Sequence, residues 1–451
     1  MANSSGKPHG IVMAAMHSSA GKTAATCALI SALRRQGVPV QPFKSGPDFI
    51  DPAYHRHFAG VPSRNLDLWM MKETGIDAEV ARVLPGKLGL IEASMGLFDG
   101  STADSDEGSA LALARYLDWP VVLVVSARGV GRSVYAAIQG FISEAGPGRI
   151  AGLVLNEVGG TGHAEYLRSA LARLDVPIVG VLMKAESLAW PERHLGLQAS
   201  QEQALPGWEE LADEVGGQYD LEALLELATP APESREERVS RNRSSPKKRI
   251  AIARDEAFHF YYESNLEGLE EWGAELVPFS PLHSEALPPA IDGVIFGGGF
   301  PEMYARGLAA NQALQRDVRR AVSDGLPCYA ECGGLIFLAE RLRMKNGEML
   351  NLTGLLPGMV EMTGRLQDFG YCSAKLDCES DGPGYPGHEF HYSRWTEESS
   401  CANLWEVKKK RTGKTRREGF SGPNMHASYI HLHRATAEPL FRKIFNLYGT
   451  A

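Results

Sequence analysis

Short apolar runs recur along the first half of the chain, and each is followed by small or polar residues. Runs of this length are typical of strands that are buried on both faces of a sheet. We predict strands at 11–15, 37–43, 88–92, 120–126, 151–156 and 177–182. Apolar residues at helical spacing follow the first strand, over 24–35, and precede the last strand, over 166–174. This alternation predicts an α/β fold with a doubly wound parallel sheet.

The same alternation begins again in the second half of the chain. Apolar runs lie at 249–253, 275–279, 291–296 and 327–331, and helices are expected over 262–272 and from 333 to about 341. These elements predict a second doubly wound domain.

Two later segments contain several histidines. Residues 426–433 alternate as a strand does, so His431 and His433 are expected on one side together with Tyr429. The segment Gly387–Tyr392 either lines a substrate cleft or forms an edge strand with exposed histidines, and its spacing favours neither.

Between the two halves, residues 229–248 are polar, charged and interrupted by proline, with almost nothing to bury. This composition is typical of a solvated connector, although its basic end could also resemble a nucleic-acid-binding arm. We therefore expect a first domain at 1–228, a linker at 229–248 and a second domain at 249–451.

Composition narrows the choice of class. A chain of 451 residues is too long for one core and favours two domains. The net charge of −9 argues against a general nucleic-acid binder. No apolar run approaches the ~20 residues that a membrane helix needs, and the N-terminus lacks the apolar core of a secretion signal. The six cysteines contain no Cys-x-x-Cys pair, so we expect the protein in the reducing cytoplasm. From the charge and the short apolar runs we expect neither a membrane nor a nucleic acid as partner.

The first strand, loop and helix have the order of a phosphate-binding P-loop. Backbone N–H groups of such a loop attract anionic oxygens, Lys22 adds a positive charge, and the Thr23 hydroxyl can ligate Mg²⁺. Met16 occupies the place of the usual first glycine, so a small-residue turn before an ordinary helix is the alternative. The candidate ATP-binding residues are Ser18, Ser19, Ala20, Gly21, Lys22 and Thr23.

Acidic residues gather where other strands of this sheet end. Glu92 and Asp99 follow the run at 88–91, and Lys44, Asp48 and Asp51 are expected together in a loop at 44–52. Carboxylates at the carboxyl ends of parallel strands can hold Mg²⁺ or position a substrate, whereas Gly-Pro-Asp alone would predict a plain surface turn. Asn156, also at a strand end, could bind adenine or form an Asn turn.

In the second half, Cys332 stands between a strand and a helix in the sequence Ala-Glu-Cys-Gly-Gly. This is the context of a nucleophile elbow, although a buried core cysteine is the commoner case. The Gly297–Gly299 turn can bring backbone amides close to a carbonyl oxygen, and a downstream histidine can take the thiol proton. Cys328 is assigned to the core.

Cys332 and the motif Tyr429–Ile430–His431 resemble the class I glutamine amidotransferases of the cobyric acid synthase branch. The segments 41–52 and 92–100 resemble the ATP domain of the dethiobiotin synthetase type. Together with Pro191–Leu197 and Gly387–Ser393, they make nearly the whole chain resemble the cobyrinate a,c-diamide synthase family.

This resemblance implies a ligase with two sites. Cys332 would attack the glutamine side-chain amide with His431 as base, and ATP with Mg²⁺ would phosphorylate a tetrapyrrole carboxylate that captures the ammonia. The a and c carboxylates of a cobyrinate-type ring would react in turn. The oligomeric state is left open, a homodimer among the options. The implied oxyanion and glutamine-binding residues are Gly298, Gly299 and Gly333; those that position substrate or metal are Lys44, Asp48, Asp51, Glu92 and Asp99, with Thr23, Asp48 and Glu92 as metal ligands.

The chain departs from the pattern of general class I amidotransferases at one informative place. Those enzymes carry a glutamate two positions after the catalytic histidine, where this chain has His433. A Cys332–His431 dyad is therefore the expectation, and a part for His433 stays open. Two other functions are considered: the same chemistry on nickel sirohydrochlorin or sirohaem, and a P-loop regulatory ATPase with an inactive amidotransferase-like domain.

Overall fold

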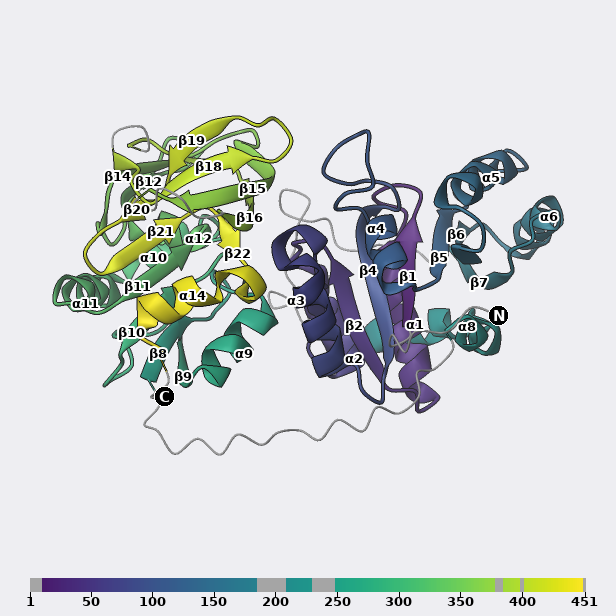
Figure 1. Cartoon of the computed structure of the whole chain (residues 1–451), viewed down its shortest axis with the longest axis horizontal. Coiled ribbons are helices and arrows are strands. Elements are labelled where there is room, and N and C mark those ends of the chain that lie inside the picture. Colours follow the sequence, from purple (N-terminus) through teal and green to yellow (C-terminus); the bar gives the residue numbers. More distant parts are fainter. Residues whose placement is uncertain (1–9, 185–207, 229–247, 378–383, 398–400, 449–451) are drawn as a thin grey trace. The chain divides into compact units, whose positions relative to one another are not determined.

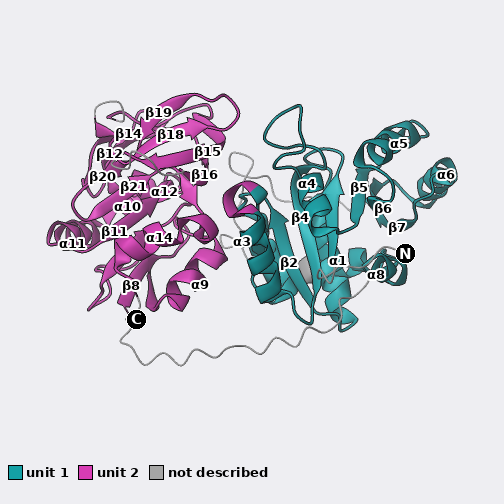
Figure 2. Cartoon of the chain, viewed as in Figure 1, with its two compact units in different colours: residues 1–68, 73–238 teal, residues 69–72, 239–451 magenta. Residues whose placement is uncertain are grey.

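The computed structural model describes residues 10–184, 208–228, 248–377, 384–397 and 401–448. The chain forms two compact units, one of residues 1–68 and 73–238 and the other of residues 69–72 and 239–451 (Figure 2). The proposed linker at 229–248 lies, apart from its last residue, outside the described residues, so the boundaries predicted from the sequence stay predictions.

The first unit is built on a seven-stranded sheet in the order β3-β2-β4-β1-β5-β6-β7 (Figure 1). All of its strands pair in parallel, which confirms the predicted sheet. The strands are β1 Gly10–Ala15, β2 Val40–Ser45, β3 Arg64–Leu66, β4 Leu88–Gly96, β5 Val121–Ser126, β6 Ile150–Val158 and β7 Ile178–Met183.

Helices connect these strands. Helix α1 packs on β1, β2 and β4, α4 packs on β1 and β4, and α8 packs on β6 and β7. The helices are α1 Lys22–Arg35, α2 Asp51–Ala59, α3 Leu68–Val83, α4 Ala110–Leu117, α5 Val134–Ala145, α6 Thr161–Leu171, α7 Trp208–Gly216 and α8 Leu221–Leu227. Side chains of the central strands are almost completely buried, as expected for strands covered on both faces.

The second unit contains a six-stranded sheet in the order β20-β21-β11-β10-β8-β9. Five strands are parallel and β20 is antiparallel at one edge. The strands are β8 Lys248–Ala253, β9 Ala274–Phe279, β10 Gly293–Phe296, β11 Cys328–Glu331, β20 Phe420–Ser421 and β21 Met425–Ser428. The helices are α9 Glu263–Glu271, α10 Ala305–Ala310, α11 Gln312–Ser323, α12 Gly333–Leu338 and α14 Arg434–Phe445.

Two further sheets in this unit are additions that the sequence analysis did not predict. One has the order β13-β12-β14-β17 and the other the order β19-β18-β15-β16-β22. Their strands are β12 Ala339–Arg343, β13 Met349–Asn351, β14 Leu356–Met362, β15 Asp368–Leu376, β16 Tyr385–His391, β17 Ser393–Trp395, β18 Trp405–Lys409, β19 Thr415–Glu418 and β22 His431–Leu432.

Three local predictions were wrong. Lys44 is part of β2 rather than of a loop, and Asp51 begins α2. The helix after Cys332 ends at Leu338, where the chain becomes extended and β12 pairs with β14. Residues 426–433 are not one strand, because β21 belongs to the six-stranded sheet and β22 pairs with β16 in another.

Among the described residues, no helix is both long enough and apolar enough to cross a bilayer. The five described cysteines are free thiols. Cys328 is fully buried, and burial raises the pKa of its thiol, which agrees with its assignment to the core.

Candidate active sites in the two units

The P-loop lies between β1 and α1. Ser19 and Gly21 both have positive φ, 63° and 78°, so the backbone coils tightly before the helix begins at Lys22. Ser18 and Ser19 are exposed and Ala20 is buried, so one side of the loop faces outward. Burial lowers the pKa of the Lys22 ammonium, and the Glu92 carboxylate acts in the opposite direction. The loop therefore has the form that favours a phosphate group.

Asn156 braces this loop. Its side-chain amide donates a hydrogen bond of 2.9 Å to the Ala20 carbonyl, and a Cβ at Gly21 would lie 2.2 Å from the Asn156 Nδ2 atom. Asn156 thus touches the loop directly, and adenine binding by Asn156 stays a prediction.

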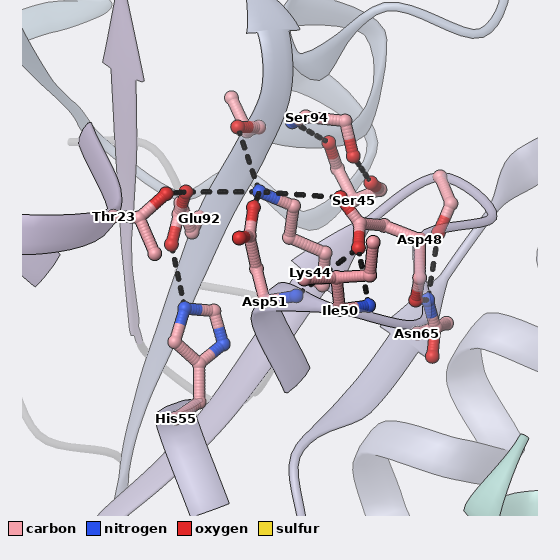
Figure 3. A network of polar contacts seen from close by, with 12 residues as sticks. Thr23, Lys44, Ser45, Asp48, Ile50, Asp51, His55, Asn65, Glu92 and Ser94 are labelled. Atoms are coloured by element: carbon pink, nitrogen blue, oxygen red, sulfur yellow. Dashed lines mark hydrogen bonds and ion pairs between the residues drawn. The ribbon is translucent and has the colours of Figure 1, made fainter. Parts of the chain in front are cut away.

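A buried lysine lies at the centre of a polar network in the first unit (Figure 3). Lys44 is 1% exposed, and its Nζ atom lies 2.6 Å from the Asp51 carboxylate and 2.9 Å from that of Glu92. Lys44 and Glu92 are direct partners in the parallel pairing of β2 with β4, which explains why their side chains meet. Lys44 and Asp51 are therefore buried in this network, whereas residues 46–48 between them form a half-buried loop.

Glu92 connects this network to the P-loop. One carboxylate oxygen, Oε1, accepts hydrogen bonds from the Thr23 hydroxyl at 2.8 Å and from Lys44, and the other, Oε2, lies 2.6 Å from the Nε2 atom of His55. Burial acts to raise the pKa of Glu92, but Lys44 and His55 outweigh it, so the net shift is downward. For Lys44, burial acts to lower the pKa, and the carboxylates of Asp51 and Glu92 outweigh it. The pair is thus held in its charged form.

The other two acidic candidates hold their own loops. Asp48 accepts the backbone N–H of Ile50 at 2.8 Å, and its second oxygen lies 3.9 Å from Nζ of Lys44. Asp99 accepts the Gly96 N–H at 2.9 Å, and its charge reaches Lys22. The structure therefore brings all the predicted acidic residues to the carboxyl edge of the sheet, beside the P-loop.

In the second unit, Cys332 occupies a strained turn between β11 and α12. Its φ of 48° and ψ of −99° are unusual for a residue with a side chain and cost about 1–3 kcal/mol. Such strain at a strand-to-helix turn is typical of a nucleophile elbow. A Cβ at Gly334 would lie 2.3 Å from the Phe296 carbonyl oxygen, so only glycine permits this close approach.

Cys332 lies near enough to His431 to act on the pKa of its ring. Burial acts to lower the pKa of His431, but the contacts with Cys332 and Glu331 outweigh it and raise the pKa to about 10. A Cβ at Gly298 would lie 2.8 Å from the His431 ring, and one at Gly333 would lie 3.1 Å from the Gly299 amide nitrogen. The structure thus gathers the predicted oxyanion glycines around the Cys332–His431 pair.

A buried carboxyl group holds the backbone at Ser428 and Tyr429, shortly before His431. Glu418 is fully buried and accepts hydrogen bonds from the Ser428 hydroxyl at 2.6 Å and the Tyr429 N–H at 2.7 Å. The Ser428 carbonyl in turn accepts the Cys332 N–H at 2.7 Å. Burial raises the pKa of Glu418 to about 8. Glu418 therefore fixes the backbone next to both catalytic candidates.

The histidines of β16 are not on an edge strand. Strand β16 lies between β15 and β22, and His388 and His391 are buried, so the edge-strand alternative is wrong. Glu389, between them, is fully buried and forms ion pairs with Lys409 and Arg416. These cations balance its charge, as a buried carboxylate requires.

Two residues in these sites were missed by the sequence analysis. His55 lies on α2 and contacts Glu92, and Glu331, at the end of β11, contacts His431 with 3.0 Å between Oε2 and Nδ1. An acidic residue inside the apolar run 327–331 was the available clue to Glu331, because such a residue needs a buried partner. The motif Pro191–Leu197 lies outside the described residues.

Each unit matches a known protein family. Residues 11–197 match the family described as the CobQ/CobB/MinD/ParA nucleotide binding domain, and residues 249–439 match the CobB/CobQ-like glutamine amidotransferase domain.

Full-length relatives share the same order of domains. Proteins named cobyrinate a,c-diamide synthase from Listeria innocua and Syntrophotalea carbinolica are each 38% identical over 94% of this chain, covering 96% and 95% of their own lengths. The protein of that name from Dehalococcoides mccartyi is 36% identical over 97% of both chains. The chain therefore belongs to the cobyrinate a,c-diamide synthase family, with a nucleotide-binding domain followed by a glutamine amidotransferase domain.

Proposed function

We propose that this protein is a cobyrinate a,c-diamide synthase of cobalamin biosynthesis, which uses ATP and glutamine to amidate the a and c carboxylates of a cobyrinate-type tetrapyrrole. The observation that carries the proposal is the identity of 36–38% to proteins of that name, which runs through both units. Each unit also contains side chains suited to one half of the reaction.

In the second unit, Cys332 would attack the side-chain carbonyl of glutamine. His431 would take the thiol proton and pass it to the departing ammonia, leaving a glutamyl thioester that water hydrolyses. Backbone amides near Gly298, Gly299 and Gly333 would stabilise the negative oxygen that forms during the attack.

In the first unit, the P-loop from Ser18 to Thr23 would bind the phosphates of ATP, with Lys22 as the principal positive charge. Phosphorylation makes the tetrapyrrole carboxylate reactive toward ammonia, because phosphate is a far better leaving group than hydroxide. Lys44, Asp51 and Asp99 would position the reacting groups, and a place for Asn156 at the adenine ring is part of the same proposal.

Mg²⁺ is part of the same proposal, because the residues beside the P-loop offer hard oxygen donors of the kind this ion prefers. Thr23 and Glu92 present hard oxygen atoms 2.8 Å apart, and Asp48 adds a carboxylate at the same sheet edge. These three residues would hold the ion, which when bound would neutralise charge on the phosphates.

The test compares two single variants with opposite expected defects. Cys332→Ser should lose glutamine hydrolysis and glutamine-dependent amidation by at least about 10³-fold, yet amidate normally with ammonium chloride. Lys22→Met should lose amidation with either nitrogen source and keep glutamine hydrolysis. The products are identified by mass spectrometry.

Amidation assays with a panel of tetrapyrrole macrocycles identify the substrate. Cobyrinate should gain two amides, whereas nickel sirohydrochlorin and sirohaem should stay unmodified. Amidation of either of those rings in preference to cobyrinate would replace the proposed substrate. If Cys332→Ser leaves glutamine turnover unchanged, the amidotransferase chemistry itself is refuted.

A further inference from the structure

We propose that Glu331, the residue immediately before the nucleophile, is the positioning carboxylate for His431 and takes the place of the glutamate that class I amidotransferases carry two residues after the histidine. This inference rests on the proposed function, since it completes the glutamine-hydrolysing site of the second unit.

Glu331 is placed for this by three hydrogen-bond donors. Its Oε2 atom lies 3.0 Å from Nδ1 of His431, and its Oε1 atom accepts the Tyr329 hydroxyl at 2.5 Å and the Leu432 N–H at 3.3 Å. Glu331 is 7% exposed and His431 is 3% exposed, so water competes little for these contacts. Both oxygens of the carboxylate are therefore fixed.

The strand explains how a residue next to the cysteine can reach the histidine. Side chains alternate along β11, so Tyr329 and Glu331 point to the same face. Glu331 is paired with Ser428 at the end of β21, from which the chain continues directly to His431. The positive φ of Cys332 then turns the thiol into the same site.

The residue at the usual position has a different set of contacts. His433 precedes α14, and its Nδ1 atom accepts the Ala435 N–H at 3.2 Å. Its ring packs edge-on against Tyr262, with 5.4 Å between ring centroids. These contacts are those of a helix cap, and His431 takes its carboxylate partner from β11 instead.

The chemical effect is to fix which nitrogen of His431 exchanges a proton with the thiol. A carboxylate only accepts hydrogen bonds, so Nδ1 keeps its proton throughout and Nε2 is the atom that exchanges a proton with the Cys332 sulfur. The S–H bond of Cys332 breaks as an N–H bond forms at Nε2, the sulfur electron pair attacks the glutamine carbonyl carbon, and the same proton leaves with ammonia. Glu331 stabilises the intervening imidazolium and transfers no proton itself.

The test uses Glu331→Gln, which keeps the size of the side chain but removes its charge. We expect kcat for glutamine hydrolysis to fall by about 10²–10⁴-fold with KM changed less than about threefold, because the orientation and charge stabilisation of His431 are lost rather than the glutamine-binding site. Tyr329→Phe, which leaves the carboxylate in place, should lose about tenfold. Amidation with ammonium chloride should be unchanged in both variants, which also verifies folding.

Two controls separate positioning from general damage. Glu340→Gln changes an exposed glutamate on β12, and His433→Asn keeps an acceptor at the helix cap; both should retain kcat within about threefold. In ¹⁵N spectra of His431, the ring should lose its second proton at a lower pH in Glu331→Gln than in wild type, because the carboxylate no longer stabilises the imidazolium.

The outcomes are distinct. A kcat for Glu331→Gln above one third of the wild-type value, or an equal loss in His433→Asn, would overturn the assignment. Glutamine hydrolysis is followed directly as glutamate release, so a wild-type protein that hydrolyses glutamine but amidates no tetrapyrrole would refute the proposed function and leave the comparison of variants valid.

Discussion

Buried glutamates in this protein differ according to the charge beside them. Glu92 faces Lys44 and His55, which together overcome the effect of burial and lower its pKa. Glu418 accepts hydrogen bonds from Ser428 and Tyr429, and burial outweighs the opposing charge of Arg416 and raises its pKa to about 8. The same side chain is therefore charged in one site and protonated at neutral pH in the other.

The raised pKa of Glu418 predicts a pH-dependent stability. An unfolded glutamate loses its proton near pH ~4.3, while folded Glu418 keeps it until about pH 8. The folded state binds more protons between these values, so this group's contribution to stability is full below pH ~4.3 and declines as pH rises through the window. Glu418→Gln should remove the decline, which amounts to at most about 1.4 kcal/mol per pH unit.

Urea unfolding at several pH values between 5 and 8 measures the free energy of unfolding of wild type and of Glu418→Gln. The free energy of unfolding of Glu418→Gln should rise relative to wild type as the pH increases, while exposed Glu340→Gln should follow wild type throughout. Parallel curves for Glu418→Gln and wild type would contradict the assigned protonation.

At the level of elements, the tightest constraint is the start of α12. A Cβ at Gly334 would lie 2.3 Å from the Phe296 carbonyl oxygen and 2.8 Å from the Phe296 Cβ, both on β10. Gly334→Ala should therefore push α12 away from the sheet, lower stability by about 1–3 kcal/mol and displace Cys332. Thermal unfolding and glutamate release should both report the loss.

Helix α5 offers a matched control. Gly140 lies inside that helix with no atom within 4 Å of an added Cβ. Gly140→Ala should stabilise the protein by about 0.4–1 kcal/mol, because alanine restricts the unfolded chain and suits a helix. A Gly334→Ala variant as stable and as active as wild type would show that the contact with β10 can relax.

The parallel strands could be predicted because each is a continuous apolar run between helical segments. The five-stranded sheet could not, since β15, β16 and β18 mix polar and apolar residues and bury Glu389 through ion pairs with other strands. The segment 426–433 looked like one strand because its pattern alternates. Its two ends belong to different sheets, because β21 pairs with β11 and β22 pairs with β16. These pairings with distant strands cannot be predicted from the local sequence.

The candidate sites were likewise predictable only where their residues belong to local motifs. Lys22, Thr23 and Cys332 belong to local motifs, whereas Glu331 becomes meaningful only when β11 brings it to His431, 100 residues further along the chain.

At the scale of the whole molecule, the proposed division at 229–248 has a direct test. This stretch contains Arg235, Arg238, Arg241 and Arg243 and almost no apolar residues. We expect trypsin at low concentration to cut first after these arginines, giving two fragments that match the proposed domains. Mass spectrometry identifies the cleavage points, and a first cut within 250–377 would contradict the proposed boundaries.

The pairing of Lys44 with Glu92 has a consequence for how the sheet assembles. A slip of β2 by one residue against β4 would turn Lys44 to the opposite face and remove its ammonium group from the buried Glu92 carboxylate, leaving only His55 beside it. Loss of one partner from a buried ion pair costs about 3–5 kcal/mol, which is a large share of a domain's stability. The ion pair beside the P-loop therefore also favours the native register of β2 against β4 over a register shifted by one residue.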